Sequence, residues 1–207
     1  MTSRTPPHAS TVRGRPRDPG IEARVFAAVQ TVYWETGWSG FTIDAVAKTA
    51  GVGRAAIYRR WPTKIELLIG ALEQVTPLHD PIDTGTLRGD LKELTRQLLS
   101  GYQSQSGLVA LRVALDARVF PELLEPLTQT ISVSRFATTR DIVRRGIDRG
   151  ELPAASNVTM LLEMLTGAAL SHILFSHEAA GPPAADADYV TRLVNLVLAG
   201  PDSASEI

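Results

Sequence analysis

The chain contains, from residue 41 to residue 67, the stretch FTIDAVAKTAGVGRAAIYRRWPTKIEL. Thr42 can cap a short helix, and Gly51 ends it because a residue without Cβ fits the left-handed backbone of a sharp exit. The apolar positions of this helix are Ile43, Val46, Ala47 and Ala50. Gly53 begins a second short helix, in which Ile57 faces inward. Two short helices joined by a glycine turn are typical of a helix-turn-helix.

A longer helix is predicted on each side of this pair. Asp18 followed by Pro19 signals a helix start. The apolar stripe that follows comprises Ile21, Val25, Ala28, Val29 and Val32, with Gly37 and Gly40 at its end. After the pair, Thr63 and Glu66 form a capping box in which each side chain satisfies the other residue's backbone N–H. These signals predict a compact helix-turn-helix head over residues 18–66.

Beyond residue 66 the apolar pattern stays helical, and no strand alternation of useful length is present. Helices are predicted over residues 87–102, 108–119 and 187–199, and one long segment runs from the Phe120-Pro121 boundary to Gly150. Residues 158–175 are apolar on nearly every face, and such a helix is expected to be buried on every face. The chain is therefore predicted to be all-α, with a larger helical domain over residues 67–207.

Charge is distributed unevenly between these two parts. Residues 1–66 carry ten bases and five acids, whereas residues 67–207 carry 11 bases and 17 acids. Residues 1–17 lack apolar periodicity and are predicted to be a flexible basic arm. A basic head on an acidic body indicates that the head binds a polyanion; a random surface imbalance is the alternative.

The helix-turn-helix identifies duplex DNA as the expected polyanion, because the major groove is wide enough to take a helix. With Ile57 inward, the outer face comprises Arg54, Ala55, Tyr58 and Arg59. Either arginine could offer a bidentate fork to guanine or contact a phosphate, and Ala55 could meet a thymine methyl group. Phosphate contacts are predicted for Thr42, Tyr58 and Lys64. The arm is predicted to reach a minor groove with Arg13, Arg15 and Arg17.

Two charged residues near helix N-termini are interpreted in opposite ways. The helix dipole disfavours Lys64 at its position, which favours a phosphate partner as the reason for its charge. Asp44 lies in the first turn of its helix, where the dipole explains an acidic residue without a further role.

The stretch resembles the TetR family of bacterial regulators over residues 21–70. The resemblance rests on three segments in order: FTIDAVA (41–47), AGVGRAAIY (50–58) and WPTKIEL (61–67). By this resemblance Thr42, Tyr58 and Lys64 match phosphate-contacting positions, and Arg54, Ala55 and Arg59 match positions that face bases. The sequence departs from the family pattern at Gly53, Ala56 and Trp61, where the family commonly has serine or threonine, threonine, and phenylalanine.

The resemblance implies a homodimer of Ω-shaped helical subunits that mostly represses transcription and releases DNA when an effector binds. Residues 85–200 loosely resemble the C-terminal domains of actinobacterial members, and the family usually builds its dimer from the last two helices. The predicted interface comprises Met164, Gly167, Ser171, Leu193, Leu196 and Val197, where Gly167 and Ser171 would allow close helix approach. A single core helix in a monomer is the alternative.

A small-molecule effector is the partner expected for the body. The predicted pocket comprises Tyr102, Phe120, Phe136, Met160, Met164 and His172, with plain core packing as the alternative. His172 is not predicted to bind a metal, because no carboxylate or histidine follows it at three or four residues.

Several classes of function are excluded by composition and motifs. The chain has no cysteine, which rules out disulfides, thiolate catalysis and Cys-ligated zinc. No hydrolase, metalloprotease, phosphate-loop or dinucleotide motif is present, so no enzyme, metal or cofactor is predicted. No apolar run is expected to span a bilayer and no secretory signal is found, which predicts a cytoplasmic location.

The sequence therefore predicts a DNA-binding transcriptional regulator, a ligand-responsive repressor that acts as a homodimer on a palindromic operator. Two other hypotheses stay open. One is a helical module that acts through protein contacts or ligand sequestration, and the other is an enzyme on a helical body. Activation of transcription is as compatible with these residues as repression is.

Overall fold

The computed structural model describes residues 20–75, 82–128, 133–175 and 183–199, and over these ranges it contains helices and no strands. The prediction of an all-α chain is therefore confirmed. The helices are α1 (Gly20–Gly40), α2 (Ile43–Ala50), α3 (Arg54–Tyr58), α4 (Lys64–Val75), α5 (Leu87–Gln103), α6 (Gln105–Asp116), η1 (Pro121–Leu123), α7 (Leu124–Leu127), α8 (Val133–Asp148), α9 (Val158–Phe175) and α10 (Pro183–Ala199).

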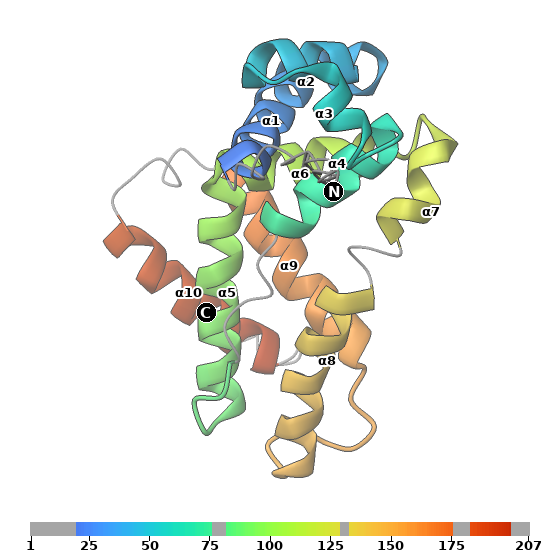
Figure 1. Ribbon diagram of the computed structural model, residues 1–207. Helices are drawn as coiled ribbons and strands as arrows, with labels where there is room; N and C mark the ends of the chain where they lie inside the picture. Colours follow the sequence, from blue (N-terminus) through green and yellow to red (C-terminus); the bar gives the residue numbers. More distant parts are fainter. Residues whose placement is uncertain (1–19, 76–81, 129–132, 176–182, 200–207) are drawn as a thin grey trace, which may run out of the picture.

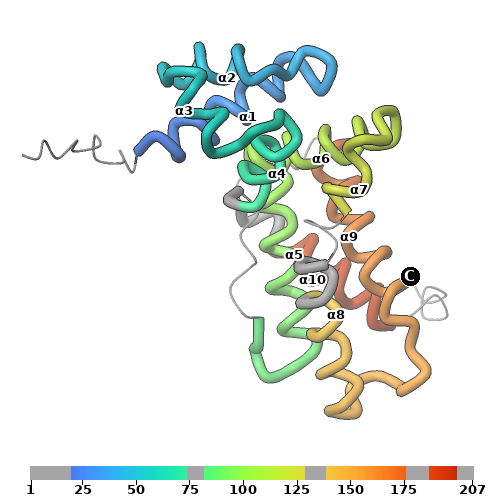
Figure 2. Tube along the Cα trace, turned by 45° about the vertical axis from the view of Figure 1, so that its right-hand side comes forward, coloured from blue at the N-terminus to red at the C-terminus, as the bar shows by residue number. Residues whose placement is uncertain are grey.

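These helices form a small head on a larger body (Figures 1 and 2). α1, α2 and α3 lie together at one end, and α5, α8, α9 and α10 form a bundle at the other, with α4 and α6 between them. One apolar core joins α1–α4 to α6 and α7, and a second core lies within the bundle. The domain boundary between residues 66 and 67 stays a prediction, and the first core extends across it.

The helices of the head begin and end as their side chains predict. Thr42 Oγ1 accepts a hydrogen bond from the N–H of Ala45 (3.1 Å), and Gly51 ends α2 with a φ of 63°. The Thr63 hydroxyl accepts from the N–H of Glu66 (3.1 Å) and donates to the Glu66 carboxylate (3.1 Å). The reciprocal contact therefore uses the Thr63 hydroxyl, where the sequence predicted the backbone N–H.

Gly37 bends the end of α1 and ties it to α6. Its φ of 60° and ψ of −172° interrupt the helical pairing of the Trp38 N–H with the Trp34 carbonyl. The Trp34 carbonyl accepts from Arg112 Nη1 instead, and the Trp38 N–H donates to Asp116 Oδ2 at 3.2 Å. Two side chains of α6 thus satisfy the backbone groups that the bend exposes, and they join the head to the body.

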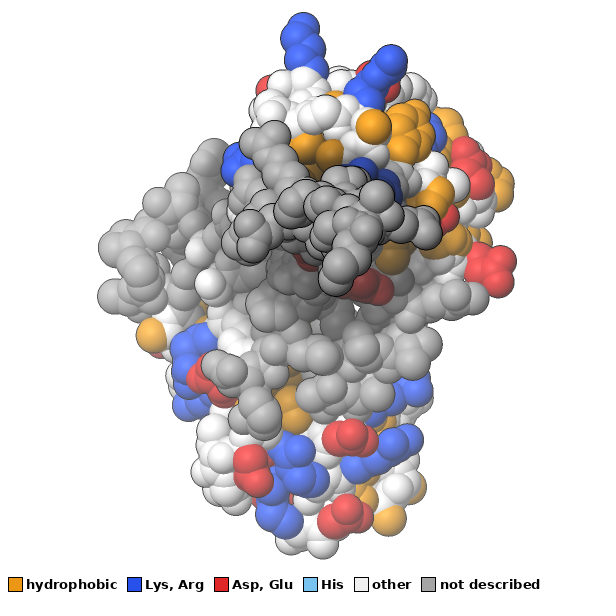
Figure 3. All heavy atoms as spheres, in the orientation of Figure 1, with side chains coloured by type: hydrophobic (Ala, Val, Ile, Leu, Met, Phe, Trp, Pro, Cys, Tyr) orange, Lys and Arg blue, Asp and Glu red, His pale blue; other side chains and the backbone are white. Residues whose placement is uncertain are grey.

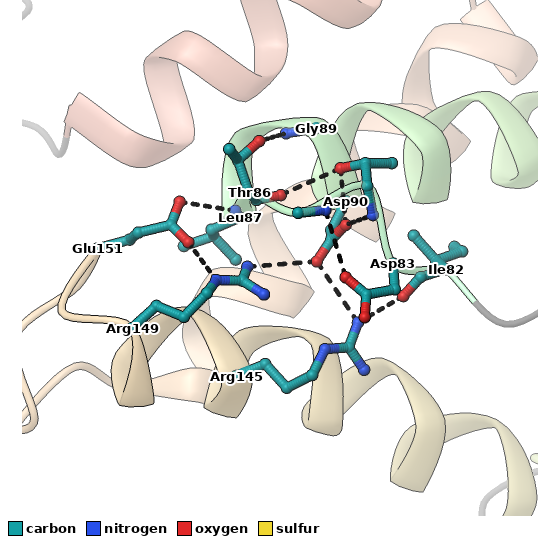
Figure 4. A network of polar contacts seen from close by, with 11 residues as sticks. Ile82, Asp83, Thr86, Leu87, Gly89, Asp90, Arg145, Arg149 and Glu151 are labelled. Carbon is teal, nitrogen blue, oxygen red and sulfur yellow. Dashed lines mark hydrogen bonds and ion pairs between the residues drawn. The ribbon is translucent and has the colours of Figure 1, made fainter.

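A buried carboxylate connects α5 to α8 at the far end of the body (Figure 4). Asp90 is fully buried and accepts from the N–H (2.6 Å) and the hydroxyl (2.8 Å) of Thr84. Its Oδ2 also lies 3.4 Å from one guanidinium nitrogen of Arg145 and 3.4 Å from one of Arg149. Glu151 pairs with Arg149 (2.5 Å) and accepts from the N–H of Leu87 (2.7 Å). Two negative and two positive side chains therefore neutralise one another at the start of α5.

Two expectations about the body need correction. The long segment predicted from Phe120 to Gly150 contains η1, α7 and α8, but α10 begins at Pro183, before the predicted start at residue 187. Contrary to the prediction, α9 is long and apolar enough to cross a membrane by length and composition. In the fold, however, one side of α9 packs against α5, α8 and α10.

The prediction that α9 is buried on every face is also wrong for the single chain. Its inner side is formed by Leu161, Leu162, Leu165 and Ala169, which are buried in the body. The outer side leaves Met160 and Met164 exposed, together with Glu163 and the last residue, Phe175, at 81%. An apolar helix with one bare face has a surface available for another molecule.

Candidate nucleic-acid interface

The outer face of α3 carries the side chains that the spacing predicts. Ile57 is fully buried against α1 and α2, whereas Arg54, Ala55, Tyr58 and Arg59 are exposed. Figure 3 shows Lys and Arg side chains projecting from the end of the head that α2 and α3 form. The inward and outward faces of the helix are thus as predicted, while the DNA contacts themselves stay predictions.

Arg59 occupies a different local setting from the other three residues. α3 ends at Tyr58, so Arg59 is the C-cap and its N–H donates to the carbonyl of Ala55 at 3.3 Å. The helix has only five residues, and its N-cap Gly53 makes no side-chain cap. The departure at Gly53 therefore costs the cap that a serine or threonine would supply.

Arg54 forms an ion pair that the sequence did not predict. Its Nη1 donates to Asp44 Oδ2 in the first turn of α2, so the pair spans the turn between the two helices. Asp44 therefore interacts with the Arg54 guanidinium as well as with the dipole of α2.

Lys64 also has partners within the chain. Its Nζ lies 3.7 Å from the centroid of the Trp38 ring and donates to the Trp38 carbonyl at 3.3 Å. The indole N–H of Trp38 donates in turn to Glu122 of η1 at 2.8 Å, and this hydrogen bond holds the pKa of Glu122 below its usual value. The phosphate role of Lys64 thus stays a prediction. Its contacts with Trp38 are a second, structural reason for a lysine at this position.

Thr42 is exposed at the N-terminus of α2, where its hydroxyl oxygen caps the helix and its hydroxyl hydrogen can still donate to a phosphate. Arg13, Arg15 and Arg17 of the predicted arm lie outside the described residues.

The predicted pocket residues whose side chains the structure describes are not brought together around one place. Phe120 packs against the core of the head, whereas Tyr102 packs against Leu99, Ala169 and Val190 of the body. Met160 and Met164 are exposed, and the side chain of Phe136 lies outside the described residues. The His172 ring stacks on that of Tyr189, with centroids 3.8 Å apart.

The six predicted interface residues divide into two groups. Met164, Gly167, Ser171 and Leu196 are exposed, and an added Cβ at Gly167 would meet nothing within 4 Å. Leu193 and Val197 are instead buried in the subunit's own core, 8% and 9% exposed, because α10 turns that side toward α5. These two residues leave little surface for a partner, and their place in an interface stays a prediction.

Sequence reasoning did not predict the polar contacts that four residues make within the head and with η1 and α6: Asp44, Trp38, Asp116 and Glu122. Asp116 accepts from the Tyr33 hydroxyl (2.7 Å), and burial together with this bond raises the pKa of Tyr33 well above its usual value. Arg112 and Asp116 are one helical turn apart, but their partners lie more than 70 residues away along the chain. Among the described residues, no group of three or more His, Cys, Asp or Glu could hold a metal ion.

The exposed third helix, the buried Ile57 anchor and the basic outer face define a helix-turn-helix DNA-binding protein. A model described as "Bacterial regulatory proteins, tetR family" matches residues 27–71, and one described as "Tetracyclin repressor-like, C-terminal domain" matches residues 81–197. The chain belongs to the TetR family of transcriptional regulators, which is not a family of enzymes.

Individual relatives agree with this assignment. An uncharacterised HTH-type transcriptional regulator of Mycobacterium tuberculosis is 31% identical over 161 residues, 75% of this chain and 79% of that protein. The DNA-binding transcriptional repressor TetR of Mycobacteroides abscessus is 28% identical over 188 residues, 85% of this chain and 90% of that protein. The crystal structure of FadR from Bacillus subtilis in complex with stearoyl-CoA shares the fold, with a TM-score of 0.67, 18% identity and coverage of 83% and 96% of the two chains.

Proposed function

We propose that this regulator is a homodimeric repressor that binds a palindromic operator and releases it when a small molecule binds the body. The observation that carries the proposal is the bare apolar face of α9 on a chain whose other end is a helix-turn-helix. Two heads joined through their bodies can reach successive major grooves, whose centres lie about 34 Å apart on one face of B-DNA. A cytoplasmic location is part of the same proposal, because a DNA-binding role requires access to the chromosome.

Dimerisation is supported by the pattern along α9. Met160, Met164, Gly167 and Ser171 recur at helical spacing and are all exposed, so they form one continuous stripe. Methionine side chains adapt their shape to a partner, and the glycine permits close approach of two backbones. The exposed side of α10 adds Leu196, which is 52% exposed.

A small-molecule effector is supported by similarity and by the connection between head and body. FadR of Bacillus subtilis, which shares the fold, was crystallised with stearoyl-CoA, and this supports a small-molecule effector for this chain. We place the effector between α5, α9 and α10, beside Tyr102 and the His172–Tyr189 stack. The hydrogen bonds of Arg112 and Asp116 to the α1 bend then give α6 a direct contact through which the body can shift the head.

Lys64→Ala is expected to weaken binding to every duplex and to reduce the salt dependence by about two units in the slope of log K against log [salt], because each subunit of the dimer loses one phosphate contact. The measurement is DNA affinity by fluorescence anisotropy across a salt series. Arg96→Ala, which removes an exposed charge from α5, is the matched control and should leave the slope unchanged. If the slope of Lys64→Ala equals that of the parent, Lys64 makes no phosphate contact and serves only to bind Trp38.

Arg59→Ala is expected to change sequence preference more than general affinity, because an arginine at the end of α3 can reach a base edge. Selection of binding sites from random DNA measures this directly. The selected consensus should lose information at one position in each half-site, whereas Arg96→Ala should return the parental consensus. The same consensus from Arg59→Ala and from the parent would refute the base-reading role.

A further inference from the structure

The ion pair between Asp44 and Arg54 joins the first turn of α2 to the first turn of α3. The Asp44 side chain is 55% exposed and that of Arg54 is 64% exposed, so the pair lies on the surface of the head. Thr42, which caps α2, is two residues from Asp44, and Ala55 follows Arg54. Both charges therefore lie among the residues predicted to face DNA.

Stability does not explain this pair. An exposed ion pair contributes little to the free energy of folding, because solvent and salt screen it. A carboxylate on a surface that approaches phosphates also lowers DNA affinity by repulsion. An acidic residue at this place is thus unfavourable for binding unless it improves the choice of sequence.

The guanidinium group offers a way to improve that choice. Arginine carries five N–H donors in a rigid plane, and Asp44 is bound through Nη1, which leaves other donors available. Residues at the N-terminus of a recognition helix contact base edges, and arginine pairs with O6 and N7 of guanine. A guanidinium held by a carboxylate has fewer orientations, so it loses less conformational entropy when it binds a base in that one geometry. The same restriction makes it fit other bases less well.

We infer that Asp44 is a positioning residue for sequence recognition: it orients Arg54 toward a guanine in the major groove. The inference rests on the proposed function, since it concerns how the same head reads an operator. It reverses the interpretation of Asp44 as a helix-dipole residue, and it assigns base reading to Arg54 at the start of α3.

Asp44→Asn is expected to reduce discrimination while increasing general affinity. The discrimination ratio is the Kd for an operator in which the guanine read by Arg54 is replaced, divided by the Kd for the intact operator. This ratio should fall about threefold to tenfold, within the range of one bidentate base contact. Affinity for unrelated duplex should rise, because a negative charge is removed. Both values come from anisotropy titrations with the full-length protein at one salt concentration, after thermal unfolding has shown that the variant is folded.

The matched control is Asp141→Asn, which removes a carboxylate from the Asp141–Arg144 pair of α8, with similar exposure of 59% and 63%. This variant should bind both duplexes like the parent. The decisive comparison repeats Asp44→Asn in an Arg54→Ala background, where the discrimination ratio should no longer respond.

Two results would overturn the inference. An unchanged ratio in Asp44→Asn would show that the pair does not guide Arg54. An equal change with and without Arg54 would show that Asp44 contacts a base itself, as a carboxylate can with cytosine. Either result requires that the parent binds the operator, so a parent that binds no duplex contradicts the proposed function instead.

Discussion

Asp90→Ala is expected to lower the free energy of unfolding by about 2–4 kcal/mol, because it removes a buried carboxylate that Thr84 and two partly exposed arginines bind. Asp90 is fully buried, and its carboxylate receives two hydrogen bonds from Thr84 and faces both Arg145 and Arg149. The substitution therefore removes the polar contacts between α8 and the start of α5, while their apolar contacts remain. In a thermal melt at fixed protein concentration, the midpoint should fall by about 10 °C.

The matched control for this prediction is Asp141→Ala. Asp141 pairs with Arg144 on the same helix, but its side chain is 59% exposed, so its loss should change the free energy of unfolding by less than about 0.5 kcal/mol. Equal effects of the two variants would mean that the network in Figure 4 does not stabilise the body.

The same network has a pH dependence with a defined sign. Burial by itself raises the pKa of Asp90, but hydrogen bonds from Thr84, Arg145 and Arg149 outweigh it, so the pKa lies below the usual 3.8. The carboxylate therefore stabilises the fold above its unfolded-state pKa, and this contribution is lost as the pH falls through the folded-state pKa. The difference in stability between the parent and Asp90→Asn should accordingly shrink below about pH 4.

Met164→Arg is expected to convert the protein into a monomer. Met164 lies in the middle of the exposed α9 stripe, and burying a charged side chain in place of an apolar one costs several kcal/mol in lost hydration. The dimer dissociation constant should rise about a hundredfold or more. Sedimentation velocity over a concentration series measures it, and affinity for a full palindrome should fall with it, because two linked heads bind more tightly than one.

Two further variants separate this effect from a loss of folding. Leu115→Arg places the same charge on an exposed apolar residue of α6, 62% exposed, and should leave the dimer intact. Gly167→Leu adds volume where an added Cβ meets nothing in the single chain, so the subunit should fold while the dimer is blocked. A dimeric Gly167→Leu protein would place the interface elsewhere.

The head could be predicted from the sequence because its signals are local. Thr42 caps α2 through a hydrogen bond to a residue three positions along the chain, and Gly51 ends the helix through its own backbone angle. Ile57 follows from spacing within one short helix. Such features depend on neighbours within one turn, and the sequence shows those neighbours directly.

The remaining features depend on residues that are distant in sequence. Asp90 meets Arg145 and Arg149 only after α5 and α8 pack, and Asp116 reaches the Gly37 bend from α6. Leu193 and Val197 have the same apolar character as the exposed Leu196, so composition could not show which side of α10 faces α5. Periodicity places residues on a face, but the partner of that face is set by the tertiary fold.

The claim on which the whole account depends is that the α2–α3 surface binds a two-fold symmetric DNA site. The most direct measurement incubates the purified protein with fragments of its genome at low ionic strength, without added compounds, and sequences the retained DNA. The retained fragments should share an inverted repeat whose half-sites lie about one helical turn apart, or a multiple of it. Retention no greater than that of an Arg54→Ala, Arg59→Ala double variant would contradict the account.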